Sequence, residues 1–395
     1  MPNSSRFRKT PIIFSMMIIA TAQVGVSIYL PSLPLISEDL SVSQASTQNI
    51  VTLFLLGFGV SQLFYGPWSD AIGRRPVFLL GQGIYLLGTL LSFLLSDSFL
   101  ALEGGRILQG LGAGSASVLG RSMLRDSYEG GQLTRALSYI SIAASVTPIL
   151  APVIGGWIAY HFSWQWVFGF VLMYLSLIFV LGVSLLPETL PYAKKRFQPS
   201  TLVGTYWRLI RNPQVIGSAA FNWVSYLGSL VSLSVFPFFI QKQLGLSVAD
   251  YATIMLFPSS GLMIGSLSLN ILNRYLTTTA LLKLSISLIF TASLWLFFTE
   301  MTVFNLVFSL SLLAISQGVS FPLSISLLLS PHKQNAGSVS ALTGAIQMVG
   351  VGIIGSLLVE YWIINAWALG VFYLSIAIIM SCLLAWRYRY IQSQQ

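Results

Sequence analysis

The sequence has little charge: Asp, Glu, Lys and Arg make up 8% of 395 residues, whereas soluble domains carry about 25%. Its single cysteine, Cys382, excludes an intrachain disulfide, and two histidines without a Cys/His cluster argue against a metal site. No Gly-x-x-x-x-Gly-Lys-Ser/Thr sequence is present, so a P-loop does not supply energy from ATP. A soluble enzyme is therefore disfavoured.

Apolar residues are abundant instead, at 55% of the chain with a mean hydropathy of +0.79. A spanning helix needs about 20 such residues. Twelve candidate spans cover residues 11–35, 47–67, 77–96, 99–121, 136–160, 164–186, 214–240, 249–272, 279–298, 303–328, 335–360 and 365–387. The first follows basic residues without a small-residue cleavage site, which favours a retained span over a signal peptide. We expect an all-α polytopic membrane protein.

The charges predict how the spans are oriented. With the N-terminus in the cytoplasm, 18 of the 20 Lys and Arg residues fall on the inner side, and the exceptions are Lys242 and Arg106. This asymmetry follows the positive-inside rule. The acids at the outer ends are Glu38, Asp39, Asp97, Asp250, Glu300 and Glu360. Both termini are thus expected in the cytoplasm, and topology, rather than a nucleic-acid partner, accounts for the net charge of +9.

The chain divides into two similar halves. A polar connection over 188–212 separates a segment at 11–187 from one at 213–387. The fourth span contains Gln109-Gly110, and the tenth contains Gln317-Gly318 at the corresponding place. The equal lengths and this match predict two six-helix bundles built on one plan.

A charged loop lies between the second and third spans. Its pattern, Gly66-x-x-x-Asp70-x-x-Gly73-Arg74-Arg75, resembles the loop between helices 2 and 3 of the major facilitator superfamily. The resemblance implies two pseudo-symmetric six-helix bundles around a central cavity, and a loop that latches the halves in the outward-facing state. The expected partners of Asp70 are Arg121, Arg125 and the start of the eleventh helix, near residues 334–337. The alternative is a basic loop that only sets topology.

Arg106 lies well inside the fourth span, and an unpaired cation there is costly and usually functional. Arg106-x-x-Gln109-Gly110-x-Gly112 resembles the family pattern linked to proton transfer and cavity organisation. The alternative is a structural arginine bonded to carbonyls of the first helix. Glu103, one turn earlier, shares a helix face with Arg106. It is either a protonatable partner of that arginine or a solvated acid at the outer mouth.

The fifth span carries prolines and glycines. Pro148, Pro152, Gly155 and Gly156 resemble the antiporter pattern ending Gly-Pro-x-x-Gly-Gly, with Ala151 in place of its first Gly. The family associates this helix with exporters. A purely structural kink is the alternative, because Pro and Gly are common in membrane helices.

Isolated polar or aromatic residues mark the expected cavity. Besides Arg106, they are Gln23, Tyr29, Gln109, Asn222, Tyr226, Gln317 and Gln347. Helix–helix hydrogen bonding is the alternative for each. Many drug antiporters of this kind carry an acid in the first helix, where this chain has Gln23. That departure removes a first-helix carboxylate as the proton site. The candidates are Arg106 and Glu103, and the alternatives are Asp70, Asp126 or the bound substrate.

The resemblance implies a bacterial inner-membrane transporter similar to bicyclomycin-resistance-type drug:proton antiporters. Such a protein is not an enzyme and has no cofactor: it moves a small amphipathic or hydrophobic compound outward against protons. A monomer in the lipid bilayer is expected. Two alternatives stay open: an exporter of a native anionic metabolite such as a siderophore, and a non-transporting membrane sensor.

Overall fold

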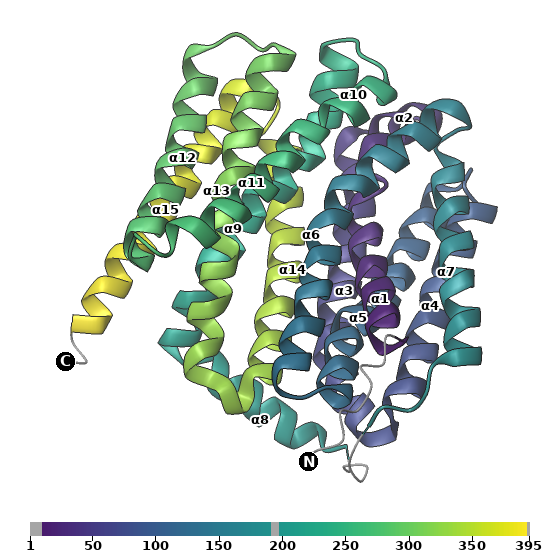
Figure 1. Cartoon of the computed structure of the whole chain (residues 1–395). Coiled ribbons are helices and arrows are strands. Elements are labelled where there is room, and N and C mark those ends of the chain that lie inside the picture. Colours follow the sequence, from purple (N-terminus) through teal and green to yellow (C-terminus); the bar gives the residue numbers. More distant parts are fainter. Residues whose placement is uncertain (1–9, 191–196, 393–395) are drawn as a thin grey trace.

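The helices form two groups that lie side by side (Figure 1). The structure is a computed structural model and describes residues 10–190 and 197–392. Within these ranges it contains helices and no strand. The first group comprises α1 to α7 and the second α9 to α15, with α8 at the lower end of the view, where α1 begins.

Apart from the short η1 and α2, the helices of the first group run nearly the full length of the bundle (Figure 1). They are α1 (Thr10–Ser27), the short η1 (Leu30–Ser32) and α2 (Leu33–Asp39), α3 (Gln44–Ile72), α4 (Arg74–Leu94), α5 (Phe99–Ser127), α6 (Gly130–His161) and α7 (Gln165–Leu185). Ser43 and Ser98 cap α3 and α5 by accepting hydrogen bonds from backbone N–H groups of the first turn.

The second group follows the linker helix α8 (Pro199–Ile210). It contains α9 (Pro213–Phe238) with η2 (Phe239–Gln243), α10 (Val248–Ile254), α11 (Leu256–Leu272), α12 (Thr278–Phe298), α13 (Val303–Leu329) with η3 (Ser330–Asn335), α14 (Ala336–Tyr361) and α15 (Ala366–Gln392). Each predicted span coincides with a helix or with consecutive helices.

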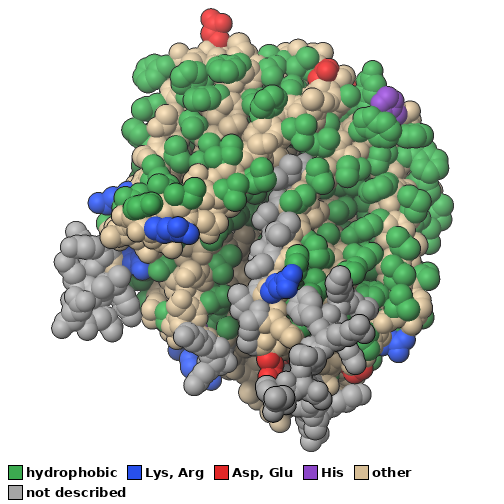
Figure 2. Space-filling model, viewed as in Figure 1, with side chains coloured by type: hydrophobic (Ala, Val, Ile, Leu, Met, Phe, Trp, Pro, Cys, Tyr) green, Lys and Arg blue, Asp and Glu red, His purple; other side chains and the backbone are tan. Residues whose placement is uncertain are grey.

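Length and composition qualify ten of the described helical segments as membrane spans. The other two predicted spans coincide with α5 and α6, which have 29 and 32 residues. The sequence of α5 is less apolar because it contains Glu103, Arg106 and several glycines. Figure 2 shows hydrophobic side chains over most of the visible face, with the Lys and Arg side chains toward its lower part.

The two groups repeat one packing arrangement. A Cβ on Gly110 of α5 would meet the backbone carbonyl of Phe54 in α3, and one on Gly57 would lie 2.6 Å from the carbonyl of Ile107. In the second group, Gly318 of α13 and Gly265 of α11 approach each other in the same way. The same spacing along the chain separates the two glycines in each half. The glycines let helix backbones meet directly, and this repetition matches the predicted internal duplication.

The linker contains an amphipathic helix where the sequence predicts only a polar connection. In α8, Leu209 is buried in a cluster that includes Val215 of α9 and Leu342 of α14, while Val203 and Trp207 are exposed. The Tyr206 hydroxyl donates to the Leu63 carbonyl of α3 at 2.9 Å. Burial raises the pKa of Tyr206 above its ordinary value, so the hydroxyl keeps the proton that it donates. The linker helix therefore contacts both groups.

Candidate transport site

Arg106 lies inside the first bundle, with 1% of the residue exposed. Its Nε donates to the Ile50 carbonyl of α3 at 2.9 Å, and its Nη2 donates to the Gly25 carbonyl of α1 at 3.1 Å. The guanidinium carbon lies 4.5 Å from the ring centroid of Tyr29 and 4.3 Å from that of Phe54. Carbonyl dipoles and aromatic faces thus compensate the buried charge.

Gln109 completes this arrangement one turn along α5. Its Oε1 accepts from Nη1 of Arg106 at 2.8 Å, and its Nε2 donates to Ser92 Oγ of α4 at 3.2 Å. The Arg106 site therefore joins α1, α3, α4 and α5 through one connected set of hydrogen bonds. The alternative role, in which Arg106 bonds to a carbonyl of the first helix, describes the observed geometry.

Glu103 does not form the predicted pair with Arg106 in the described part of the chain. Its Oε1 instead accepts from Asn49 Nδ2 at 3.4 Å, near the start of α3. The physical reason is that Arg106 turns inward to satisfy carbonyl groups of α1 and α3, whereas Glu103 is only half-buried. The carboxylate and the guanidinium occupy different environments although they are one turn apart.

The polar residues predicted in the second half also bind each other or the backbone. Asn222 Nδ2 of α9 donates to Gln347 Oε1 of α14 at 2.9 Å, and Gln317 Nε2 of α13 donates to the Ser225 carbonyl at 2.7 Å. Tyr226 is half-buried against Phe321, with ring centroids 6.3 Å apart. Asn222 Oδ1 is buried without a hydrogen-bond partner in the described structure.

In the first half, the remaining predicted cavity residues lie on or just after α1. Gln23 is half-buried, whereas Tyr29 is almost fully buried and stacks on Phe168 of α7 at a centroid distance of 4.4 Å. Tyr29 thus connects the guanidinium of Arg106 with the side of the bundle formed by α7.

Residues 66–76, expected as a loop, form the end of α3, the turn at Gly73 and the start of α4, and they carry a compact ionic cluster at the lower end of the first bundle (Figure 1). Asp70 pairs with Nη1 of Arg74 at 2.7 Å, and Nε of Arg74 pairs with Asp126 of α5 at 2.7 Å. The shown partner of Asp70 is therefore Arg74 rather than Arg121 or Arg125, both of which are exposed. Arg74 is favoured because it follows Asp70 by four residues across a tight turn. Side chains 333–335 lie outside the described residues, so the expected contact with the eleventh helix is not tested.

Glu188, which the sequence places in the linker, belongs to this cluster. Its Oε1 accepts from the backbone N–H of Arg74 at 2.9 Å, and its Oε2 accepts from that of Arg75 at 3.3 Å. It thereby caps the free N–H groups at the start of α4. Gly73 has φ +117°, a conformation that favours glycine, and a Cβ there would collide with the Glu188 carboxylate.

Comparison with known proteins decides the family. Residues 15–355 match the profile described as "Major Facilitator Superfamily". The chain belongs to the major facilitator superfamily. This transporter is 30% identical over 354 residues to multidrug resistance protein D of Escherichia coli, covering 88% of this chain and 87% of that protein. It is 29% identical to multidrug resistance protein MdtL of Salmonella typhi, with 82% of each chain covered.

Solved structures show the same fold. The transporter superposes on a D-xylose-proton symporter with a TM-score of 0.72 at 13% identity, over 93% of this chain and 96% of that one. It superposes on the nucleoside transporter NupG with a TM-score of 0.72 at 15% identity, over 95% and 98% of the two chains. These similarities confirm the expected two-bundle fold. The family match and the multidrug-resistance relatives show that the chain is a multi-pass membrane transporter rather than an enzyme.

The ends of the two bundles opposite to the linker helix α8 touch each other. The Lys242 ammonium of η2 forms an ion pair with Glu38 of α2, and Gln241 Nε2 donates to the Pro31 carbonyl of η1 at 2.9 Å. Arg106 and Lys242 are the two basic residues that the sequence does not place on the inner side. Arg106 is enclosed within a bundle, whereas Lys242 joins the two bundles.

The predicted antiporter helix contacts both bundles near the C-terminal end of α6. A Cβ on Gly155 of α6 would collide with the Ile28 carbonyl, which follows α1, whereas one on Gly156 would lie 2.6 Å from Cβ of Ala252 in α10. Pro148 and Pro152 lie inside α6, one to two turns before these glycines. Consecutive glycines therefore allow α6 to pack against its own bundle on one side and against the other bundle on the adjacent side.

Proposed function

We propose that this transporter exports small amphipathic or hydrophobic compounds across a bacterial inner membrane in exchange for protons. The observation that carries the proposal is the similarity to multidrug resistance protein D, which extends over 88% of this chain. The substrate is moved by alternating access, in which the two bundles rock around a site near the membrane midplane. No cofactor takes part, and the proton gradient supplies the energy.

The described contacts support a state that is closed toward the outer side. The Glu38–Lys242 ion pair and the Gly156–Ala252 contact both join the outer ends of the bundles. Opening toward that side requires these contacts to separate. The asymmetric charges support the orientation in which this end is periplasmic and both termini are cytoplasmic.

The proposed substrate contacts come from both bundles, and α14 packs against α3 of the first bundle. In α9, Asn222 retains a free acceptor, Oδ1, beside Gln347 of α14. Arg106 contributes the positive charge of a guanidinium that is held by neutral groups. For proton coupling we retain Glu103, the acid nearest to Arg106 along α5, as the titrating carboxyl group.

A native anionic metabolite is the second candidate substrate class. It is favoured by one observation: the described ion pairs give Arg106 no carboxylate partner, so the first bundle carries an uncancelled buried positive charge. A siderophore is one compound of this chemical class. Transport of an anion and transport of a cationic dye differ in their dependence on the membrane potential.

The experiment is transport into proteoliposomes that hold the purified full-length protein. An imposed pH gradient is expected to drive accumulation of a fluorescent drug such as ethidium in inverted vesicles, and a protonophore is expected to abolish it. The matched control is liposomes without protein. Drug uptake at the same rate with and without the pH gradient would contradict proton exchange. Absence of uptake for every drug of a panel would contradict the proposed substrate class.

A further inference from the structure

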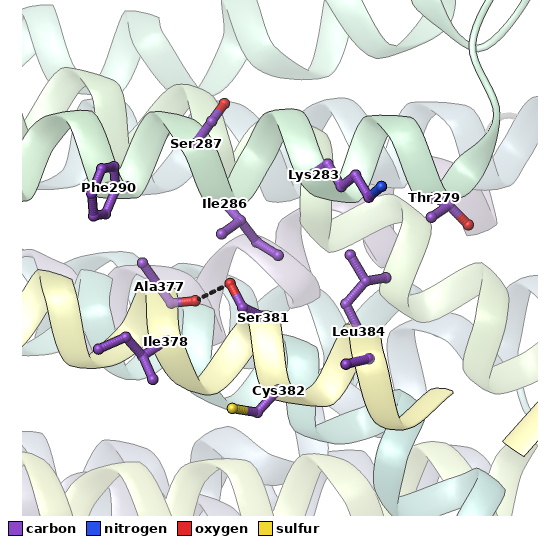
Figure 3. Close-up of a pocket in the computed structure, with 11 residues that line it drawn as sticks. Thr279, Lys283, Ile286, Ser287, Phe290, Ala377, Ile378, Ser381, Cys382 and Leu384 are labelled. Atoms are coloured by element: carbon purple, nitrogen blue, oxygen red, sulfur yellow. Dashed lines mark hydrogen bonds between the residues drawn. The ribbon is translucent and has the colours of Figure 1, made fainter. Parts of the chain in front are cut away.

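A groove opens on the second bundle between α12 and α15, far from Arg106 in the other bundle. It has a volume of about 810 Å³ and is lined mainly by apolar groups, among them Ile286, Phe290, Ile378 and Leu384. Figure 3 shows Ile286 and Leu384 extending from the two helices toward the space between them. At the opposite end the helices are in contact, because Ser293 Oγ of α12 donates to the Gly370 carbonyl of α15 at 2.8 Å.

Polar groups mark the end of the groove near the start of α12. Lys283 lies five residues after Thr278, the first residue of α12, and thus about 7 Å along the helix. In Figure 3 its side chain extends toward Thr279, and Ser381 lies on the facing helix. A lysine at this depth keeps its stem in an apolar region while its ammonium reaches the interface.

No carboxylate side chain of the described residues neutralises Lys283. From residue 189 onward the sequence has three acids, Asp250, Glu300 and Glu360, and these lie at the ends of helices opposite to the start of α12. Lys283 takes part in none of the three described ion pairs. The groove therefore combines an apolar wall with one unmatched positive charge at its inner edge.

We propose that this groove binds an anionic phospholipid of the cytoplasmic leaflet. Its phosphate would contact Lys283 and the Thr279 hydroxyl, and one acyl chain would lie along Phe290 and Ile378. The cytoplasmic leaflet is the negatively charged one, and basic pockets between membrane helices on that side bind anionic head groups. The assignment of this end to the cytoplasm rests on the charge asymmetry of the whole chain.

Cys382 lines the same groove and is the only cysteine of the sequence, so its reactivity reports occupancy. The full-length protein in detergent is treated with N-ethylmaleimide at increasing concentrations of phosphatidylglycerol, phosphatidylcholine or inorganic phosphate. Phosphatidylglycerol is expected to slow the reaction at lower concentration than phosphatidylcholine does. Equal protection by the two lipids, or protection by inorganic phosphate, would overturn the proposal without reference to any variant.

Variants then test the role of the charge. Lys283→Gln is expected to raise the phosphatidylglycerol concentration for half-protection about fivefold, the factor for one basic residue near an anionic surface. Lys283→Arg should retain the preference, as should Arg274→Gln, which removes an exposed charge outside the lining of the groove. An unchanged preference in folded Lys283→Gln would contradict the proposed contact. The lipid proposal is tested by protection of Cys382 and not by drug transport. Its result is therefore independent of whether the proposed drug export is confirmed.

Discussion

At the scale of single residues, the guanidinium of Arg106 makes a set of contacts that an ammonium group cannot make. It donates through three separate nitrogens to Ile50, Gly25 and Gln109, and it lies between two rings. Hydrogen bonds to charged groups contribute about 1.5–3 kcal/mol each. The arrangement requires the flat, forked shape of arginine rather than positive charge alone.

We therefore expect Arg106→Lys to lower transport at least tenfold and to lower the unfolding temperature of the purified protein. Lysine keeps the charge but cannot reach α1, α3 and Gln109 together. Efflux assays and thermal unfolding in detergent measure the two effects. Arg274→Lys, at an exposed position, should leave both unchanged. Full activity in Arg106→Lys would show that charge alone is sufficient.

Glu103 allows a separate test of proton coupling. Glu103→Gln is expected to abolish pH-driven accumulation while leaving drug binding in place, because the amide cannot gain or lose a proton in this range. Asn49→Ala is the matched control, since it removes the hydrogen bond at 3.4 Å but keeps the carboxyl group. Proton flux measured with a pH dye during transport reports the outcome. Persistent coupled flux in Glu103→Gln would place the titrating group elsewhere.

The sequence predicts which residues are unusual but not which residues they meet. Arg106 stands out because a cation inside an apolar helix is rare. Its acceptors are backbone carbonyls of α1 and α3, which have no residue-type signal. Glu188 is missed for a related reason: it caps a helix that begins more than a hundred residues earlier, and only the folded chain brings the two together.

At the scale of elements, the approach of α6 to α10 depends on the absence of a side chain at Gly156. A side chain there would enter the volume of Ala252 and the Val248 carbonyl in α10. The outer ends of the two bundles could then no longer approach each other this closely. We infer that Gly156, which approaches the other bundle, affects the change between conformational states more than the packing of one bundle.

Gly156→Leu is accordingly expected to reduce transport at least tenfold and to favour the state open to the outer side. Spin-label distances between the outer ends of α2 and α10, measured in a Cys382→Ser background, should lengthen. Gly104→Leu in α5 is the control, because a Cβ added there would have no other atom within 4 Å, and normal transport is expected. Unchanged distances in Gly156→Leu would refute the role assigned to this contact.

The positions of the helices are largely predictable because each needs a long apolar segment in a membrane. The predicted span 303–328, for example, corresponds to α13 at Val303–Leu329. The break after Ser27 and the helix α8 are not predicted. The first depends on Pro31 and tertiary packing, and the second is a short amphipathic helix whose apolar positions at 202, 206 and 209 were available in the sequence.

At the scale of the whole molecule, the ion pair between Glu38 and Lys242 is one of the contacts that join the two bundles at this edge, beside the Gln241–Pro31 hydrogen bond and the Gly156–Ala252 contact. Lys242→Glu is expected to replace attraction with repulsion and to increase the population of the state open to the outer side. The double exchange Glu38→Lys with Lys242→Glu should restore the wild-type distribution. The same spin-label distances measure both variants, at low and at high salt.

High salt should reduce the difference between the single variant and the wild type, since exposed charges are screened. Lack of restoration in the double exchange would indicate that Lys242 acts through some other contact. A surface ion pair contributes about 1 kcal/mol or less, so the expected change is a shift of population by severalfold, not a permanent lock.

The linker helix has a consequence for the speed of the transport cycle. Tyr206 is hydrogen-bonded to α3, whereas Leu209 packs with α9 and α14. The helix α8 therefore spans the seam, which is the boundary between the two bundles, and is attached to both of them. Rocking that widens this seam must first release one of the two attachments. The linker would then slow the conformational change, and the turnover rate would depend on the strength of the contacts of α8, although α8 supplies none of the proposed substrate contacts.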